Sequence, residues 1–140
     1  MIGRALPTSR TMAEFEEQRH LVAALELFGV PFLASMNGAR MGRAAAGKAK
    51  ATGMRRGVPD LMIVRPPPAM AGQVGMAIEL KRADLKPKSA RAARWSGATV
   101  EQRETMAMLE LYGWHCVVAY GAADALRQLA AAGYSVGRLA

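Results

Sequence analysis

Two short stretches decide the fold of this chain: GVPDLMIV at residues 57–64 and MAIELKR at residues 76–82. Each holds an apolar run of strand length, and a turn-rich connection separates them, which predicts an antiparallel hairpin. Asp60, Glu79 and Lys81 lie at the ends of these runs. The chain has only 11 acidic residues against 19 basic ones. Two isolated carboxylates and a lysine, tied to buried strands in a basic chain, suggest a metal site that acts on a polyanion.

The alternation of side chains along a strand sets the faces of the second stretch. Residues two apart share a face, so Glu79 and Lys81 point the same way, and Met76, Ile78 and Leu80 point the other way into the core. Glutamate and lysine are poor strand formers. Their placement beside an apolar stripe therefore predicts a role other than packing.

The turn before the first strand brings an acid to the same place. Pro59 makes the turn rigid and Gly57 permits a close approach, so Asp60 enters the strand at a fixed position. If the two strands pair, Asp60 and Glu79 converge. Two carboxylates suit Mg²⁺, for which Mn²⁺ may substitute, because it takes oxygen ligands and keeps several waters. Lys81 would orient a water or stabilise negative charge.

Composition bounds the class of protein. The 140 residues and 51% hydrophobic content predict one folded domain, residues 12–140, after a flexible tail at residues 1–11. The net charge of +8 favours a polyanionic partner such as nucleic acid. No apolar run is long enough for a membrane helix. The single cysteine, Cys116, suits a reducing cytoplasm.

Hydrophobic spacing predicts seven elements in the order α-β-β-β-α-β-α, which is a small α/β fold with helices around a mixed sheet. The helices are predicted at residues 12–28, 99–112 and 122–132, and the strands at residues 30–36, 60–65, 75–81 and 114–120. The predicted core residues of the first two helices are Phe15, Leu21, Val22, Leu25, Phe28, Val100, Met106, Leu109 and Leu111.

Two segments are strongly basic, and each adjoins one of the two deciding strands. Residues 37–57 read as a long basic loop with at most one helical turn, and a loop this long is usually functional. Residues 82–99 form the second segment. Trp95 within it is interpreted as a core anchor or as a base-stacking group. The predicted DNA-contacting residues are Asn37, Arg40, Arg43, Lys48, Lys50, Arg55, Arg56, Lys86, Lys88, Arg91 and Arg94.

The order GVPD, strand, loop, strand, ELK resembles the PD-(D/E)xK nuclease superfamily. More closely, it resembles the stand-alone VRR-NUC nucleases of phages and bacteria. The resemblance runs from about residue 14 to residue 129. Besides residues 57–60 and the pair Glu79 and Lys81, the matching positions are Glu14 with Gln18, Asn37 with Gly38, and Gln102 with Gly113.

This resemblance implies a restriction-endonuclease-like core and a set of site residues. Asp60 and Glu79 would bind the divalent metal with help from the backbone carbonyl of Leu80, and Lys81 would be the catalytic lysine. A glutamate of the first helix would complete the acidic set.

Two assignments stay open at this point. The helix-one glutamate is either Glu14 or Glu17, which lie about one turn apart. Gln102 either sits beside Lys81 and holds a water or phosphate, or is only a helix-start residue.

The function expected from the residues and the resemblance is a Mg²⁺-dependent DNA endonuclease, with branched DNA such as a four-way junction as substrate. A domain of this size has little room to contact two strands, so a homodimer is expected if junctions are cut. The alternatives are a non-catalytic nucleic-acid-binding module on the same fold and a regulatory protein that binds RNA. GRAAAGKA at residues 42–49 resembles a phosphate loop but has Ala49 where Ser or Thr should bind Mg²⁺, so no nucleotide cofactor is expected.

Overall fold

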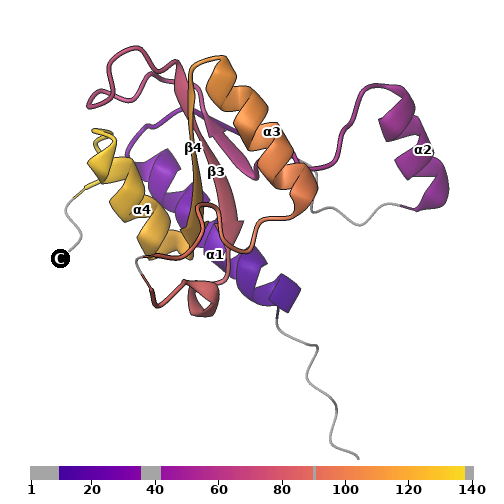
Figure 1. Cartoon of the computed structure of the whole chain (residues 1–140), viewed down its shortest axis with the longest axis horizontal. Helices are drawn as coiled ribbons and strands as arrows, with labels where there is room; N and C mark the ends of the chain where they lie inside the picture. Colours follow the sequence, from indigo (N-terminus) through magenta and orange to yellow (C-terminus); the bar gives the residue numbers. More distant parts are fainter. Residues whose placement is uncertain (1–9, 36–41, 90, 138–140) are drawn as a thin grey trace, which may run out of the picture.

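The computed structural model describes residues 10–35, 42–89 and 91–137 (Figure 1). Most of the predicted tail lies outside this part, as do the predicted DNA contacts Asn37 and Arg40. Arg10 and the residue after it, predicted in the tail, already belong to the first helix. In chain order the elements are α1 (Arg10–Leu27), β1 (Phe32–Ala34), α2 (Arg43–Ala51), β2 (Leu61–Ile63), β3 (Gly75–Lys81), η1 (Ala83–Leu85), α3 (Val100–Leu111), β4 (Trp114–Tyr120) and α4 (Ala122–Ala131).

The four strands form one mixed sheet in the order β1-β2-β3-β4. Strand β2 pairs antiparallel with both β1 and β3, with Leu61 opposite Ile78 in the second pair. Strand β4 runs parallel to β3, with Tyr120 level with Lys81. The predicted hairpin and the mixed sheet are therefore confirmed. Strands β1 and β2 are shorter than predicted, at three residues each.

Helices cover both faces of the sheet. Helices α1 and α4 pack together on one face, where Met76, Ile78 and Leu80 of β3 meet Leu21 and Leu25 of α1. Helix α3 packs on the other face against β4. Strand β3 is buried at every position, since it lies inside the sheet with helices on both sides. This burial is what makes the two charged residues of β3 chemically unusual.

The core prediction is confirmed for one stripe of each helix and wrong for the rest. Leu21, Leu25 and Met106 are fully buried, and Val22 and Leu109 are partly buried against the core. The residues predicted as core but found exposed are Phe15, Phe28, Val100 and Leu111. At 3.6 residues per turn, Val100 and Leu111 fall on the half of α3 that faces away from Met106, so they cannot reach the sheet.

The predicted order of elements lacks helix α2, which lies in the basic segment predicted as a loop, and the short 3-10 helix η1. Six of the nine residues of α2 are alanine or glycine, and alanine has the highest helix propensity. No residue of α2 is buried, and Figure 1 shows the helix standing apart from the sheet and its other helices. Within the described residues, no helix is both long and apolar enough to cross a membrane.

Candidate nuclease site

The β2–β3 register brings the two predicted metal ligands together. Asp60 directly precedes β2, and continuing the antiparallel register by one pair sets it opposite Glu79. The Asp60 Oδ2 accepts a hydrogen bond of 2.7 Å from the backbone N–H of Leu80. Leu80 lies beyond the first residue of β2, so no backbone carbonyl of β2 is available to its N–H. The Asp60 carboxylate accepts this hydrogen bond instead. Asp60 is thus fixed by the sheet itself.

Burial disfavours the charged forms of the Asp60 and Glu79 carboxyl groups. The exposed fraction of Glu79 is 4%, and that of Lys81 is 8%, so these two charged side chains do not lie on a solvent-exposed face of the sheet. Burial raises the pKa of Glu79, and the adjacent charge of Asp60 raises it further, while Lys81 lowers it. Burial also raises the pKa of Asp60, although the Leu80 N–H opposes that shift. A buried and a half-buried carboxyl group this close favour a bound cation between them.

One oxygen of the pair is left without a partner. Glu79 Oε2 is buried and no described group makes a hydrogen bond of normal geometry to it, although the side chain and the backbone of Asp60 both lie near enough to shift the Glu79 pKa. A buried carboxylate oxygen without a donor is unfavourable by about 1–3 kcal/mol or more. Together with the neighbouring Asp60, this oxygen fits a small oxygen-binding cation such as Mg²⁺.

Gln102 ties the lysine and the glutamate into one network. Its Nε2 donates to Glu79 Oε1 at 2.7 Å, and its Oε1 accepts from Lys81 Nζ at 3.1 Å. The Lys81 Nζ lies 3.8 Å from Glu79 Oε1. The structure therefore places Gln102 beside Lys81, as one of the two readings of the sequence proposed.

The same glutamine also caps the start of helix α3. Its Oε1 accepts from the backbone N–H of Thr99 at 2.8 Å, and its own N–H donates to Thr99 Oγ1 at 3.2 Å, which is a capping box. The motif Thr-x-x-Gln at residues 99–102 is a readable signal for a helix start. Thr99 is thus a supporting residue that sequence reasoning missed and that this signal would have found.

Gly57 locks the turn of Asp60 against the start of α3. Its φ of +87° is in the left-handed region, and a Cβ there would lie 2.4 Å from the backbone O of Glu101 and 2.9 Å from the N of Gln102. Only glycine fits both conditions without strain. The turn that carries Asp60 and the helix that carries Gln102 are therefore in direct backbone contact.

The two candidate glutamates of α1 have different surroundings. Glu17 Oε2 accepts a hydrogen bond of 2.5 Å from the backbone N–H of Ala122, the first residue of α4. Glu14 lies near Arg82, whose pKa is raised first by its hydrogen bond to Asp84 and also by the charge of Glu14. Glu14 therefore lies near the carboxyl end of β3. Glu17 lies at the same end, since Gly121, the neighbour of Ala122, donates its N–H to the Lys81 carbonyl. Among the described residues, no group of three acids, histidines or cysteines is close enough to bind one metal.

The first basic segment keeps its positive charge. Among the described residues, no acid forms an ion pair with Arg43, Lys48, Lys50, Arg55 or Arg56. All five are exposed. This segment leads along the chain directly to Gly57 and the candidate site.

The second basic segment is partly neutralised by acids from other elements. Lys86 Nζ lies 3.5 Å from Asp124, and Arg94 forms two hydrogen bonds to the Glu110 carboxylate. Asp84 is the only acid within this segment itself, and the fold brings the other two acids from α4 and α3. Lys88 and Arg91 are exposed, with no acid partner in the part of the chain that the structure describes.

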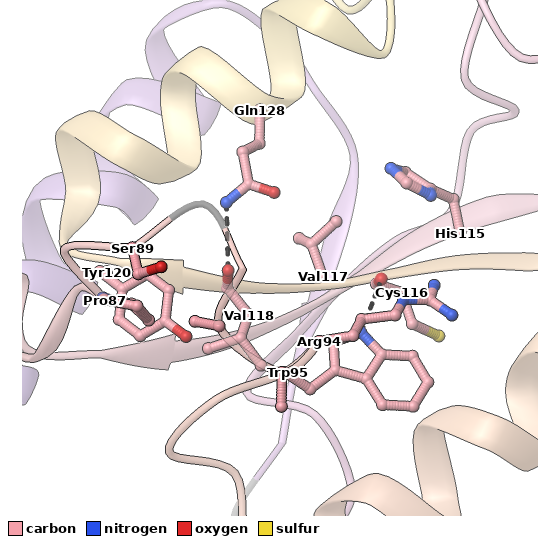
Figure 2. Close-up of a pocket in the computed structure, with 12 residues that line it drawn as sticks. Pro87, Ser89, Arg94, Trp95, His115, Cys116, Val117, Val118, Tyr120 and Gln128 are labelled. Atoms are coloured by element: carbon pink, nitrogen blue, oxygen red, sulfur yellow. Dashed lines mark hydrogen bonds between the residues drawn. The ribbon is translucent and has the colours of Figure 1, made fainter.

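A groove of about 380 Å³ runs along the outer edge of β4, and Figure 2 shows its lining residues. The Trp95 indole Nε1 donates to the Cys116 carbonyl at 3.1 Å, and Gln128 Nε2 donates to the Val118 carbonyl at 3.1 Å. The Arg94 guanidinium stacks on the Trp95 ring at 4.2 Å. Trp95 is thus an anchor that covers a sheet edge, which agrees with the first of its two readings.

Comparison with known proteins gives a structural match. No protein-family model matches the sequence, and no curated protein matches it either. A solved structure described as a VRR_NUC domain protein superposes with a TM-score of 0.57 and 24% sequence identity, over 89% of this chain and 90% of that one. This chain shares the VRR_NUC fold. The VRR_NUC resemblance is thus confirmed at the level of the fold, and the phage or bacterial stand-alone type stays a prediction.

Proposed function

We propose that this protein is a metal-dependent DNA endonuclease of the PD-(D/E)xK type, with a restriction-endonuclease-like core. The observation that carries the proposal is the pairing of half-buried Asp60 with buried Glu79. Among the described residues, Glu79 Oε2 has no hydrogen bond of normal geometry, and Glu79 Oε1 contacts Gln102 and Lys81. A metal site needs a carboxylate oxygen that no protein donor already occupies, and Glu79 Oε2 meets that need. The shared VRR_NUC fold supports the same reading.

The residues present fit a Mg²⁺ ion, with Mn²⁺ as a substitute. Asp60 and Glu79 would hold it, and the carbonyl of Leu80 is the predicted third protein ligand. When bound, the ion would supply a more acidic coordinated water and a positive charge near the phosphate. The rest of its coordination would come from water, as is usual for Mg²⁺ in proteins.

The side chains around the pair have separable roles in phosphodiester hydrolysis. The Lys81 ammonium would donate to the attacking water or to a phosphate oxygen that gains charge as the P–O bond breaks. Gln102 would hold the Lys81 and Glu79 side chains in fixed positions relative to each other through its two hydrogen bonds. No side-chain nucleophile is needed, because water supplies the oxygen.

The distribution of charge supports DNA as the substrate. The unpaired cations lie on the segment that leads to the site and on the segment that follows β3, so both flank the proposed metal. A structure-selective activity on branched or four-way-junction DNA, performed by a homodimer in the cytoplasm, is the specific form of this proposal.

A cleavage assay tests the proposal. We expect the protein to cut labelled branched DNA with Mg²⁺ or Mn²⁺, and to cut linear DNA more slowly. We also expect EDTA, Asp60→Ala and Glu79→Ala each to abolish cutting. Cleavage that persists in EDTA or in either variant would contradict the assignment. The comparison of branched with linear DNA tests structure selectivity separately.

The second candidate is a non-catalytic DNA-binding module. It is favoured by one observation: neither Glu14 nor Glu17 joins Asp60 and Glu79 in a three-acid group among the described residues. Binding of DNA without cleavage, in any divalent metal, would support the module over the enzyme.

The roles of the two α1 glutamates can be separated by matched substitutions. We expect Glu17→Gln to lower the free energy of unfolding by about 1 kcal/mol, because its carboxylate caps the start of α4, and to leave cleavage largely intact. We expect Glu14→Gln to lower cleavage with little change in stability, because Glu14 lies toward the site. Denaturant titration and cleavage rates measure the two effects, and the reverse pattern would assign the site to Glu17.

A further inference from the structure

Helix α2 has an unusual composition for a helix on a folded domain. Its nine residues comprise three cations, Arg43, Lys48 and Lys50, and otherwise only alanine and glycine. It contains no acid and no side chain able to form a hydrophobic core. The surface of α2 therefore consists of three long cationic side chains on a helix whose other side chains are small.

The surroundings of α2 point to a partner outside the chain. No residue of the helix is buried, and Figure 1 shows it projecting from the body as an arm. A helix of nine residues without tertiary packing is only marginally stable in water. Since its cations have no acid partner among the described residues, the complementary partner is a polyanion.

We propose that α2 lies in the major groove of duplex DNA next to the cleavage site and holds the duplex by its phosphates without reading its sequence. This inference rests on the proposed function and specifies its substrate as one with a duplex flank. The major groove, about 12 Å wide, admits an α-helix. A helix made mostly of alanine and glycine has a smaller diameter than a helix with larger side chains. It can therefore lie deep in the groove while its long cationic side chains reach the phosphates.

The composition of α2 also explains the expected lack of sequence preference. Readout of all four base pairs uses asparagine, glutamine and acidic side chains besides arginine and lysine, and α2 has none of the first three. Contacts from cations to phosphates position a protein without specifying a sequence. The single arginine, Arg43, is at the first position of the helix, and the other two cations are lysines. The arm can therefore fix the position of a duplex but has almost nothing with which to select bases.

The root of the arm connects it to the chemistry. The chain runs from the end of α2 to Gly57, whose backbone packs against Glu101 and Gln102, and three residues later it reaches Asp60. A duplex held by the arm would thus be positioned relative to the two metal ligands through a short connection that is anchored at Gly57.

Binding measurements in EDTA test the charge of the arm without requiring cleavage. The probes are a 30-base-pair duplex and a single strand of the same length. We expect the triple variant Arg43→Gln, Lys48→Gln, Lys50→Gln to bind the duplex roughly 100- to 500-fold more weakly at about 0.1 M salt, and to lower the slope of log affinity against log salt by about 2–3. Binding to the single strand should fall much less.

A matched control changes the same charge elsewhere. Arg19→Gln, Arg65→Gln, Arg127→Gln removes three cations from other surfaces, and we expect less than about one third of the loss in slope. Equal losses in the two triple variants, or equal losses on duplex and single strand, would overturn the proposal. A change of oligomeric state with unchanged duplex affinity would assign the arm to contacts between copies instead. A protein that binds duplex through the arm but never cleaves would retain this inference and lose the proposed function.

Two substitutions at one position separate helix shape from charge. Gly47 has open space around it, so Gly47→Ala strengthens the helix without a clash, whereas Gly47→Pro breaks it. We expect duplex affinity to rise by up to about 4-fold in the first and to fall by at least about 10-fold in the second. Competition by methyl green, which occupies the major groove, but not by netropsin, which occupies the minor groove, is the expected pattern. Unchanged affinity in both Gly47 variants would contradict a groove-bound helix.

Discussion

Replacing Glu79 by glutamine is expected to stabilise the metal-free protein while abolishing DNA cleavage. Glutamine cannot ionise, so folding no longer carries the cost of keeping an acid protonated next to Asp60, and its amide oxygen can still accept the hydrogen bond from Gln102. We expect the melting temperature in EDTA to rise by roughly 3–8 °C, as for other active-site residues whose native charge is unfavourable. Cleavage in Mg²⁺ should fall by about 100- to 1000-fold or more.

The pH dependence of stability follows from the same group. The pKa of Glu79 is raised from 4.5 to about 9, so the folded protein holds a proton that the unfolded chain releases. Stability should therefore be greatest below about pH 4.5 for this group and decline as the pH rises toward 9. In Glu79→Gln this decline should shrink, and in Mg²⁺ the wild type should recover stability most at high pH.

The control for this experiment is Glu104→Gln, which removes an exposed acid of α3. It should leave both the melting temperature in EDTA and the cleavage rate within error of the wild type. A lower melting temperature for Glu79→Gln in EDTA would mean that Glu79 is a stabilising ion-pair partner of Lys81, and the metal-site interpretation would then fail.

The substitution Gly57→Ala is expected to damage both stability and activity, although it lies outside the charged network. The new Cβ would meet the Glu101 carbonyl at 2.4 Å, in a backbone conformation that disfavours any side chain. We expect a loss of about 2–4 kcal/mol in the free energy of unfolding. Because the turn must move away from α3, the Asp60 carboxylate and Gln102 should separate, and cleavage should fall even at a temperature where the variant is folded.

Gly53→Ala is the matched control, since Gly53 also has a positive φ, of +108°, but has no atom within 4 Å of an added Cβ. It should show the backbone strain alone, about 1 kcal/mol, with near-normal cleavage of DNA. If the two variants behaved alike in cleavage at matched folded fractions, the contact between the Asp60 turn and α3 would have no part in the activity.

The sequence predicted the candidate site best where the alternation of side chains in β3 combined with the hairpin between β2 and β3. Alternation in β3 placed Glu79 and Lys81 on the face opposite Met76, and the hairpin set Asp60 beside them, so three site positions followed from local rules. Their partner Gln102 lies 21 residues beyond Lys81, and only packing of α3 on the sheet makes that contact. Local pattern alone left two readings of Gln102 open.

The failures have a similar physical origin. The segment before β2 combines alanines, which favour a helix, with glycines and cations, which are typical of loops, and the alanines prevail in α2. Helical spacing identified Val100 and Leu111 as core, although the sheet reaches only the Met106 side of α3. The neutralising contacts of Lys86 and Arg94 with Asp124 and Glu110 join residues 38 and 16 positions apart, and no local signal reports them.

The covered edge of β4 limits how two copies of the chain can assemble. Its outward carbonyls at Cys116 and Val118 accept side-chain donors, and the N–H of Tyr120 donates to Asp124. A continuous sheet through this edge would first have to break all three bonds. If the protein acts as a pair, its two sheets must therefore meet through helices or through the short strand β1, and that choice would set the spacing between the two candidate sites.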